Sequence, residues 1–131
     1  MAAGWATGLR HLEQALTNTS AGKRAAAVAD LRIARAAHIH FATVANQARF
    51  VMARDALRND KLPAEKRQNL RSQIVRLVDD EVELARKLFT LARQDCRIGF
   101  EASNHYYYVP LDMVEKVINC LFIRQQYAAK K

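Results

Sequence analysis

Apolar side chains recur every three or four positions through most of this chain, the spacing that places them on one face of a helix. Four helices are predicted from this pattern. Two are long, Lys23–Asn59 and Ala64–Gln94, and two are shorter, Gly4–Leu16 and Pro110–Tyr127. Only four glycines and two prolines are present, so few residues interrupt the helices.

Each long helix carries a seam of residues spaced by four and three. In the first long helix the seam is Ala27, Leu31, Ala34, His38, Phe41, Ala45, Ala48 and Met52. In the second it is Leu70, Ile74, Leu77, Glu81, Leu84, Leu88 and Leu91, with a second apolar stripe beside it. The turn between the helices is short, so the pair is predicted to be antiparallel. Two stripes on the second long helix indicate packing against more than one neighbour.

A loop is predicted between the second long helix and the last helix. It spans Asp95–Val109 and is rich in tyrosine. The apolar face predicted for the last helix is Leu111, Val114, Ile118 and Leu121. The predicted fold class is therefore all-α: a single helical domain over residues 1–131, formed as a helical bundle around a long antiparallel helix pair, with a Tyr-rich loop before the last helix.

The net charge of +8 raises the question of anionic partners. We favour a solvated, arginine-rich helix surface as its explanation. The excess is concentrated at the tip where the long helices meet, and the candidate contacts to nucleic acid there are Arg54, Arg58, Lys61, Arg67 and Arg71. Aromatic residues are nearly absent from this stretch, which argues against stacking on single strands and leaves contact with phosphate open.

Two histidines and two glutamates are candidates for a metal or acid–base site. Folding the long pair about Asp60–Lys61 places His38 roughly level with Glu83. It places His40 level with Glu81 in the same way. We favour a buried His–Glu hydrogen bond that sets the helix register, because a polar pair in an apolar seam is a known register device. No Glu-x-x-His pair of the kind used by two-metal bundles is present, so no metal or cofactor is predicted.

The Tyr-rich loop is the second place where functional side chains concentrate. Its candidate ligand-binding residues are Glu101, Asn104, His105, Tyr106, Tyr107 and Tyr108. Aromatic rings beside amide, imidazole and carboxyl groups suit a sugar or a base. We favour a structural plug, with tyrosine rings packed in the helical groove and hydroxyls at the surface. No second carboxylate is placed to complete glycosidase chemistry, so no catalytic residue is assigned.

The cysteines and the apolar runs leave the compartment undecided. Cys96 and Cys120 have no CxxC spacing, and two buried free thiols are expected, with a disulfide between them left open. The N-terminal residues show no charged segment followed by an apolar run, so no signal peptide is predicted. No apolar stretch approaches the length of a membrane span, so no membrane partner is expected. A complete chain of this kind is expected in the cytoplasm, and a fragment leaves the localisation unknown.

A resemblance to a known family rests on the string DCRIGFEASNHYYYVPLDMVEKVINC, residues Asp95–Cys120. It resembles the end of the C-terminal all-helical region of large bacterial glycoside-hydrolase-like proteins. Earlier segments fit the same pattern: Gly4–Gly8, His40–Phe41, Ala45–Phe50 and Arg54–Asp55. The resemblance implies a helical module that packs on a sugar-active domain and lends loop residues to its cleft. In such proteins the catalytic residues are expected in a preceding barrel domain, so no catalytic role is carried over to this chain.

These observations lead to one main functional hypothesis and two rivals. The main hypothesis is a non-catalytic accessory or structural module of carbohydrate-active origin, whose partner is a catalytic domain or a carbohydrate. The rivals are a small basic nucleic-acid-binding protein and a homo-oligomeric interaction protein. A dimer is expected because the two short helices are not long enough to cover both stripes of the second long helix.

Overall fold

The structure is all-helical, as the apolar spacing predicts. This computed structural model describes residues 2–99 and 109–128, and these contain α1 (Ala2–Thr17), α2 (Ala21–Ala56), α3 (Ala64–Gln94) and α4 (Pro110–Ala128). No strand occurs in these two ranges. Proline marks two of the starts: Pro63 is the N-cap of α3, and Pro110 is the first residue of α4. Its fixed φ and missing N–H suit a first helical turn.

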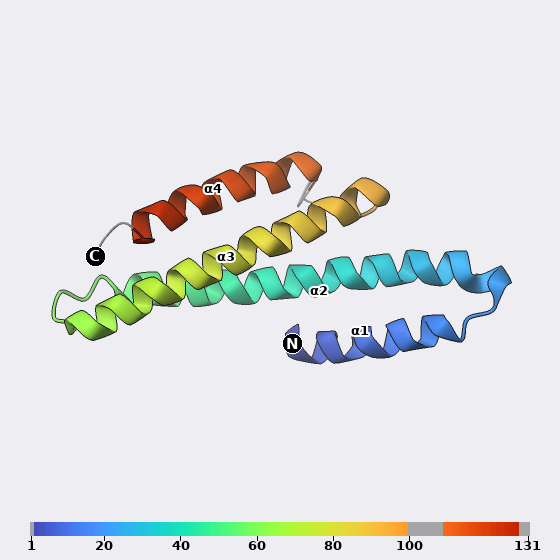
Figure 1. Cartoon of the computed structure of the whole chain (residues 1–131), viewed down its shortest axis with the longest axis horizontal. Helices are drawn as coiled ribbons and strands as arrows, with labels where there is room; N and C mark the ends of the chain where they lie inside the picture. Colours follow the sequence, from blue (N-terminus) through green and yellow to red (C-terminus); the bar gives the residue numbers. More distant parts are fainter. Residues whose placement is uncertain (1, 100–108, 129–131) are drawn as a thin grey trace.

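The helices form an open array in which each backbone neighbours only the helix before it and the helix after it. Within the described ranges, α1 packs on α2, α2 on α3, and α3 on α4, with no other pair of helix backbones in contact. Figure 1 shows α2 and α3 side by side with the chain reversing direction between them. The N-terminal end of α1 lies near the middle of α2, and α4 lies on the other side of α3. The array is therefore not a closed bundle, because α1 and α4 do not meet.

The small-residue seam predicted on α2 faces α1 rather than α3. Trp5 Nε1 donates a hydrogen bond to the Ala34 carbonyl oxygen (2.9 Å), and the Trp5 ring lies 5.1 Å from that of Phe41. The α2 residues that join the core with α3 are Ala36, Ile39, Phe50, Ala53 and Leu57. Ile39 and Ala53 each lie one position after a seam residue, about 100° further around the helix. Ala36 lies two positions before the seam residue His38, about 200° around the helix. The prediction of a seam facing α3 is therefore wrong.

Helix α3 is the centre of the hydrophobic core. One cluster joins Ile39, Ala85, Leu88, Ala92, Ile98 and Met113, and a second joins Ala53, Ile74, Val78, Val82 and Cys120. Every residue of both predicted stripes of α3 is buried or half-buried. This confirms that α3 packs against more than one neighbour. The two stripes therefore give no reason to expect a dimer, because α2 and α4 together cover both of them.

The apolar face predicted for α4 is exposed. Leu111 is 74% exposed and Ile118 is 61% exposed, with Val114 and Leu121 at 45% each. The helix instead turns Met113 and Cys120 towards α3, and both are buried. Apolar residues therefore lie on two sides of α4, and periodicity does not say which side meets the core. No described helix is long and apolar enough to cross a bilayer.

Truncation at the centre of this core should destabilise the whole array. Ile74 is 0% exposed, so Ile74→Ala removes three buried carbons from α3 and leaves a cavity; we expect a loss of about 2–5 kcal/mol in the free energy of unfolding. Urea unfolding followed by circular dichroism measures it. Ile33→Ala is the matched control, because Ile33 is 37% exposed on α2. An equal loss in both variants would contradict the central position of Ile74.

Candidate functional site

A groove of about 320 Å³ lies where α2, α3 and α4 approach one another. Its walls are Asn46, Gln47, Phe50, Val51, Leu77, Val78, Glu81, Lys116, Cys120 and Ile123. The backbones of α2 and α4 do not touch, but their side chains do: the Phe50 and Tyr127 rings meet edge to face, with centroids 6.4 Å apart. The groove is thus an apolar cleft with a few convergent polar groups, the usual composition of a binding site.

One carboxylate links the three helices that form this groove. Glu81 of α3 is only 6% exposed. Its Oε1 forms an ion pair with Lys116 Nζ of α4, and its Oε2 accepts a 3.4 Å hydrogen bond from Asn46 Nδ2 of α2. A buried carboxylate is tolerated when it is paired and hydrogen-bonded. Because each partner comes from a different helix, the contact fixes the register of α2 and α4 against α3.

The expected pairing of the histidines with Glu81 and Glu83 is wrong in register. Asn46 holds the α2 position opposite Glu81, and it lies eight residues, about 12 Å, beyond His38. The Asn46–Glu81 contact is centred between Pro63 and Ala64, about three residues beyond Asp60–Lys61, where the reversal was expected. Glu83 instead forms an exposed pair with Arg86 (2.9 Å). His40 stacks edgewise on its neighbour Phe41.

The described residues contain no group of three or more histidine, cysteine, aspartate or glutamate side chains placed to hold a metal. Lys116 and Asn46 lie in this site but were not predicted from the sequence. Asn46 continues the three-and-four spacing of Ile39, Phe50 and Ala53 on the α3-facing side of α2. That spacing could have placed Asn46 on the side of α2 that faces α3. The seam that faces α1 is more regular, so it gave the stronger pattern in the sequence.

Both cysteines are free, and only one of them is buried. Cys120 lies in the groove, where burial and the neighbouring Glu81 carboxylate raise the pKa of its thiol, while the Lys116 ammonium acts in the opposite direction. A raised pKa keeps this thiol protonated and poorly nucleophilic. Cys96 is exposed, contrary to the expectation of two buried thiols, because it lies in the turn after α3.

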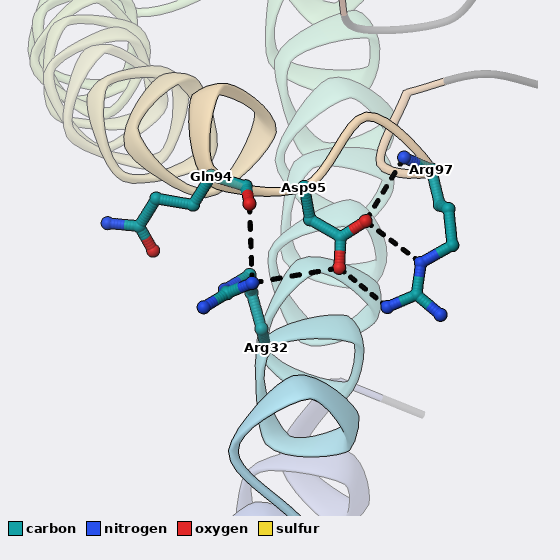
Figure 2. Close-up of polar contacts among 4 residues, drawn as sticks. All are labelled: Arg32, Gln94, Asp95 and Arg97. Atoms are coloured by element: carbon teal, nitrogen blue, oxygen red, sulfur yellow. Dashed lines mark hydrogen bonds and ion pairs between the residues drawn. The ribbon is translucent and has the colours of Figure 1, made fainter. Parts of the chain in front are cut away.

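An ionic network closes the end of α3 (Figure 2). The carboxylate of Asp95, which is 8% exposed, accepts hydrogen bonds from Arg97 Nε (2.9 Å), Arg97 Nη2 (2.7 Å) and the Arg97 backbone N–H (3.1 Å). Arg32 of α2 donates to the Gln94 carbonyl oxygen (3.3 Å) and lies 3.8 Å from Asp95 Oδ2. These contacts lower the pKa of Asp95 to about 2, with the Arg97 hydrogen bonds as the main cause.

This network lies just before the stretch that contains the ligand-binding candidates. Ile98 is buried in the core, and Gly99 follows it with φ 88°, a conformation that favours glycine. The loop candidates Glu101, Asn104, His105, Tyr106, Tyr107 and Tyr108 lie outside the described residues. Their proposed ligand contacts therefore stay predictions.

Four of the five residues predicted for the basic tip line a single hollow. Arg54, Arg58, Arg67 and Arg71 lie around a pocket of about 310 Å³, together with Leu57, Gln126 and Tyr127. Arg67 also holds the turn, since it donates to the carbonyl oxygens of Leu57 (3.1 Å) and Asn59 (3.0 Å). Lys61 is exposed in the turn and does not line the pocket.

Comparison of the chain with protein-family models, with curated proteins and with solved structures found no match. Function is therefore inferred from the geometry and chemistry of the described residues.

Breaking the Glu81–Lys116 pair from one side should cost more than replacing both partners. Lys116→Met leaves a buried carboxylate without its cation, and we expect a loss of about 3–5 kcal/mol in the free energy of unfolding. Lys116→Met combined with Glu81→Leu should recover most of this loss. Arg86→Met is the control, because the exposed Glu83–Arg86 pair should contribute less than about 1 kcal/mol. A double variant less stable than Lys116→Met would contradict the prediction.

Stability should fall in acid partly through Asp95. Its pKa is lowered from 3.8 to about 2 by folding, so its contribution is complete above pH 4 and is lost as the pH falls from 4 to 2. Urea unfolding measured between pH 2 and 6 should therefore give a shallower pH dependence for Asp95→Asn than for the unaltered chain. Asp60→Asn, in the exposed turn, is the control. Parallel pH profiles for Asp95→Asn and the unaltered chain would show that the network contributes nothing.

Proposed function

We propose that this chain is a non-catalytic helical interaction module that associates with a second copy of itself through the outer face of α4. The observation that carries the proposal is the exposed apolar stripe on that helix. Its members are Leu111, Val114, Ile118, Leu121 and Phe122. The first four are separated by three, four and three residues, which is the spacing of an apolar stripe that packs against a partner helix.

The exposed residues of this stripe are large, and they lie beside an apolar groove rather than scattered singly over the surface. Phe122 is 62% exposed and Ile118 is 61% exposed, although both are large and apolar. A neighbouring groove of about 380 Å³ between α3 and α4 is lined in part by Ala85, Phe89 and Val117 together with Val114 and Ile118. Continuous apolar surface on a folded domain marks an interaction site. The groove gives a partner side chain a place to insert, which is typical of the centre of an interface.

The charges along α4 favour a second α4 in the antiparallel direction. Asp112 and Glu115 lie near its N-terminus, and Arg124, which also pairs with Asp79 of α3 in its own chain (2.6 Å), lies near its C-terminus. An antiparallel pair of α4 helices centred near Ile118 brings the acidic end of each copy to the basic end of the other. A two-fold axis at that point makes the contact self-complementary, as in most homodimers.

In this proposal the long antiparallel pair of α2 and α3 serves as a rigid scaffold for α4 and for the Tyr-rich loop. The resemblance to the C-terminal regions of glycoside-hydrolase-like proteins suggests a carbohydrate-active catalytic domain as the competing occupant of the same surface. A chain that stays monomeric at every concentration tested would favour that domain over a second copy.

A single charge in the stripe should separate the copies. The unaltered chain is expected to be a dimer by light scattering coupled to size-exclusion chromatography. Ile118→Glu should give a monomer with unchanged helicity, because two carboxylates would face each other in an apolar contact. Ile33→Glu places the same charge at another exposed apolar position and should stay dimeric. A monomeric unaltered chain, or a dimer that survives Ile118→Glu, would refute association through this face.

A further inference from the structure

The arginine pocket at the tip is formed by the end of α2, the turn that follows it and the start of α3. Arg54 lies in the last turn of α2, and Arg58 lies two residues beyond the end of that helix. Arg67 and Arg71 are four residues apart near the start of α3, which places them on the same side of that helix. The turn between α2 and α3 brings the two pairs to one hollow, and Tyr127 of α4 completes it.

The positive charges of Arg54 and Arg58 are only partly compensated. Asp55 Oδ1 is the carboxylate oxygen paired with Arg54 Nη2 (3.0 Å) and with Arg58 Nη1 (3.7 Å), so two guanidinium groups share it. Arg67 donates to neutral carbonyl oxygens, which fix its geometry and leave its charge in place. A concave surface lined by charges of one sign concentrates the potential and attracts the opposite ion.

The hollow is also rich in hydrogen-bond donors. Guanidinium groups only donate, and the Gln126 amide and the Tyr127 hydroxyl can donate as well. The Tyr127 ring is held by its edge-to-face contact with Phe50. Phosphate oxygens are acceptors, and arginine binds them through two parallel N–H groups. The pocket therefore matches a phosphate group in both charge and hydrogen-bonding capacity.

We propose that this pocket binds a compact polyphosphate, a ligand that carries two or more adjacent phosphate groups. Arg54, Arg58 and Arg71 would hold the phosphates, and Arg67 is the positioning residue that keeps the turn in place. The pocket is concave and bounded by the ends of three helices, whereas a nucleic-acid backbone follows basic residues spread along a surface. Its lining shares no residue with the α4 stripe, so this site is independent of the proposed self-association.

Calorimetric titration with pyrophosphate and with tripolyphosphate at low salt tests the proposal. We expect binding that weakens with added salt, because salt screens the charges. Arg58→Gln should weaken it about tenfold, since a charged hydrogen-bonding partner is lost. Arg58 is 74% exposed, so this variant should fold normally, which circular dichroism checks. Asp55→Asn should tighten binding, because it releases both Arg54 and Arg58 from their shared carboxylate.

The control and the competing ligands make the result decisive. Arg24→Gln removes the same charge from the exposed start of α2, at the far end of the helix, and should leave the affinity unchanged. The proposal is overturned by an absence of pyrophosphate binding at low salt, or by equal weakening in Arg24→Gln and Arg58→Gln. It is also overturned if a DNA duplex or a single-stranded oligonucleotide binds at this tip and pyrophosphate does not compete with it.

Discussion

The buried carboxylate of Glu81 is held by one partner from each helix that flanks α3. Removing a carboxylate from water is costly unless other charges and donors replace the lost hydration. Here Lys116 of α4 and Asn46 of α2 supply that replacement. Apolar contacts alone would let neighbouring helices slide by a turn at little cost, whereas a displaced Glu81 would be left buried and unpaired. This contact therefore sets the register within which the two core clusters of α3 form.

The open arrangement follows from how the apolar surface is divided among the helices. In the described ranges, α3 forms one core cluster after another with α2 on one side and α4 on another. Helix α1 covers one end of α2 and stops near its middle, so Met52 further along the same seam is 72% exposed. Helix α4 has one side on the core and another facing solvent. The fold thus completes its core while leaving the outer side of α4 available, and that side supports the proposed association.

Different hydrogen bonds and ion pairs stabilise the two ends of the pair of long helices. At the tip, Arg67 donates to the carbonyl oxygens of Leu57, just after α2, and of Asn59 in the turn. At the other end, Arg32 satisfies the Gln94 carbonyl oxygen, and the carboxylate of Asp95 holds Arg97. The first set of contacts concentrates cations around a hollow. The second fixes the backbone of the turn after α3, so the two ends carry different sets of charged side chains on the same scaffold.

The sequence by itself determined the four helices, their approximate limits and the two-sided burial of α3, because these depend on local spacing and on proline positions. It also identified the basic tip, since charge is a matter of composition. The tertiary structure decided which faces meet. The regular seam of α2 faces α1, the regular stripe of α4 faces solvent, and Glu81 pairs with Asn46 and Lys116 rather than with His38 or His40. Periodicity assigns a residue to a face of its own helix, but the neighbour of that face and the register along it depend on turn length and on contacts between residues 35 positions apart.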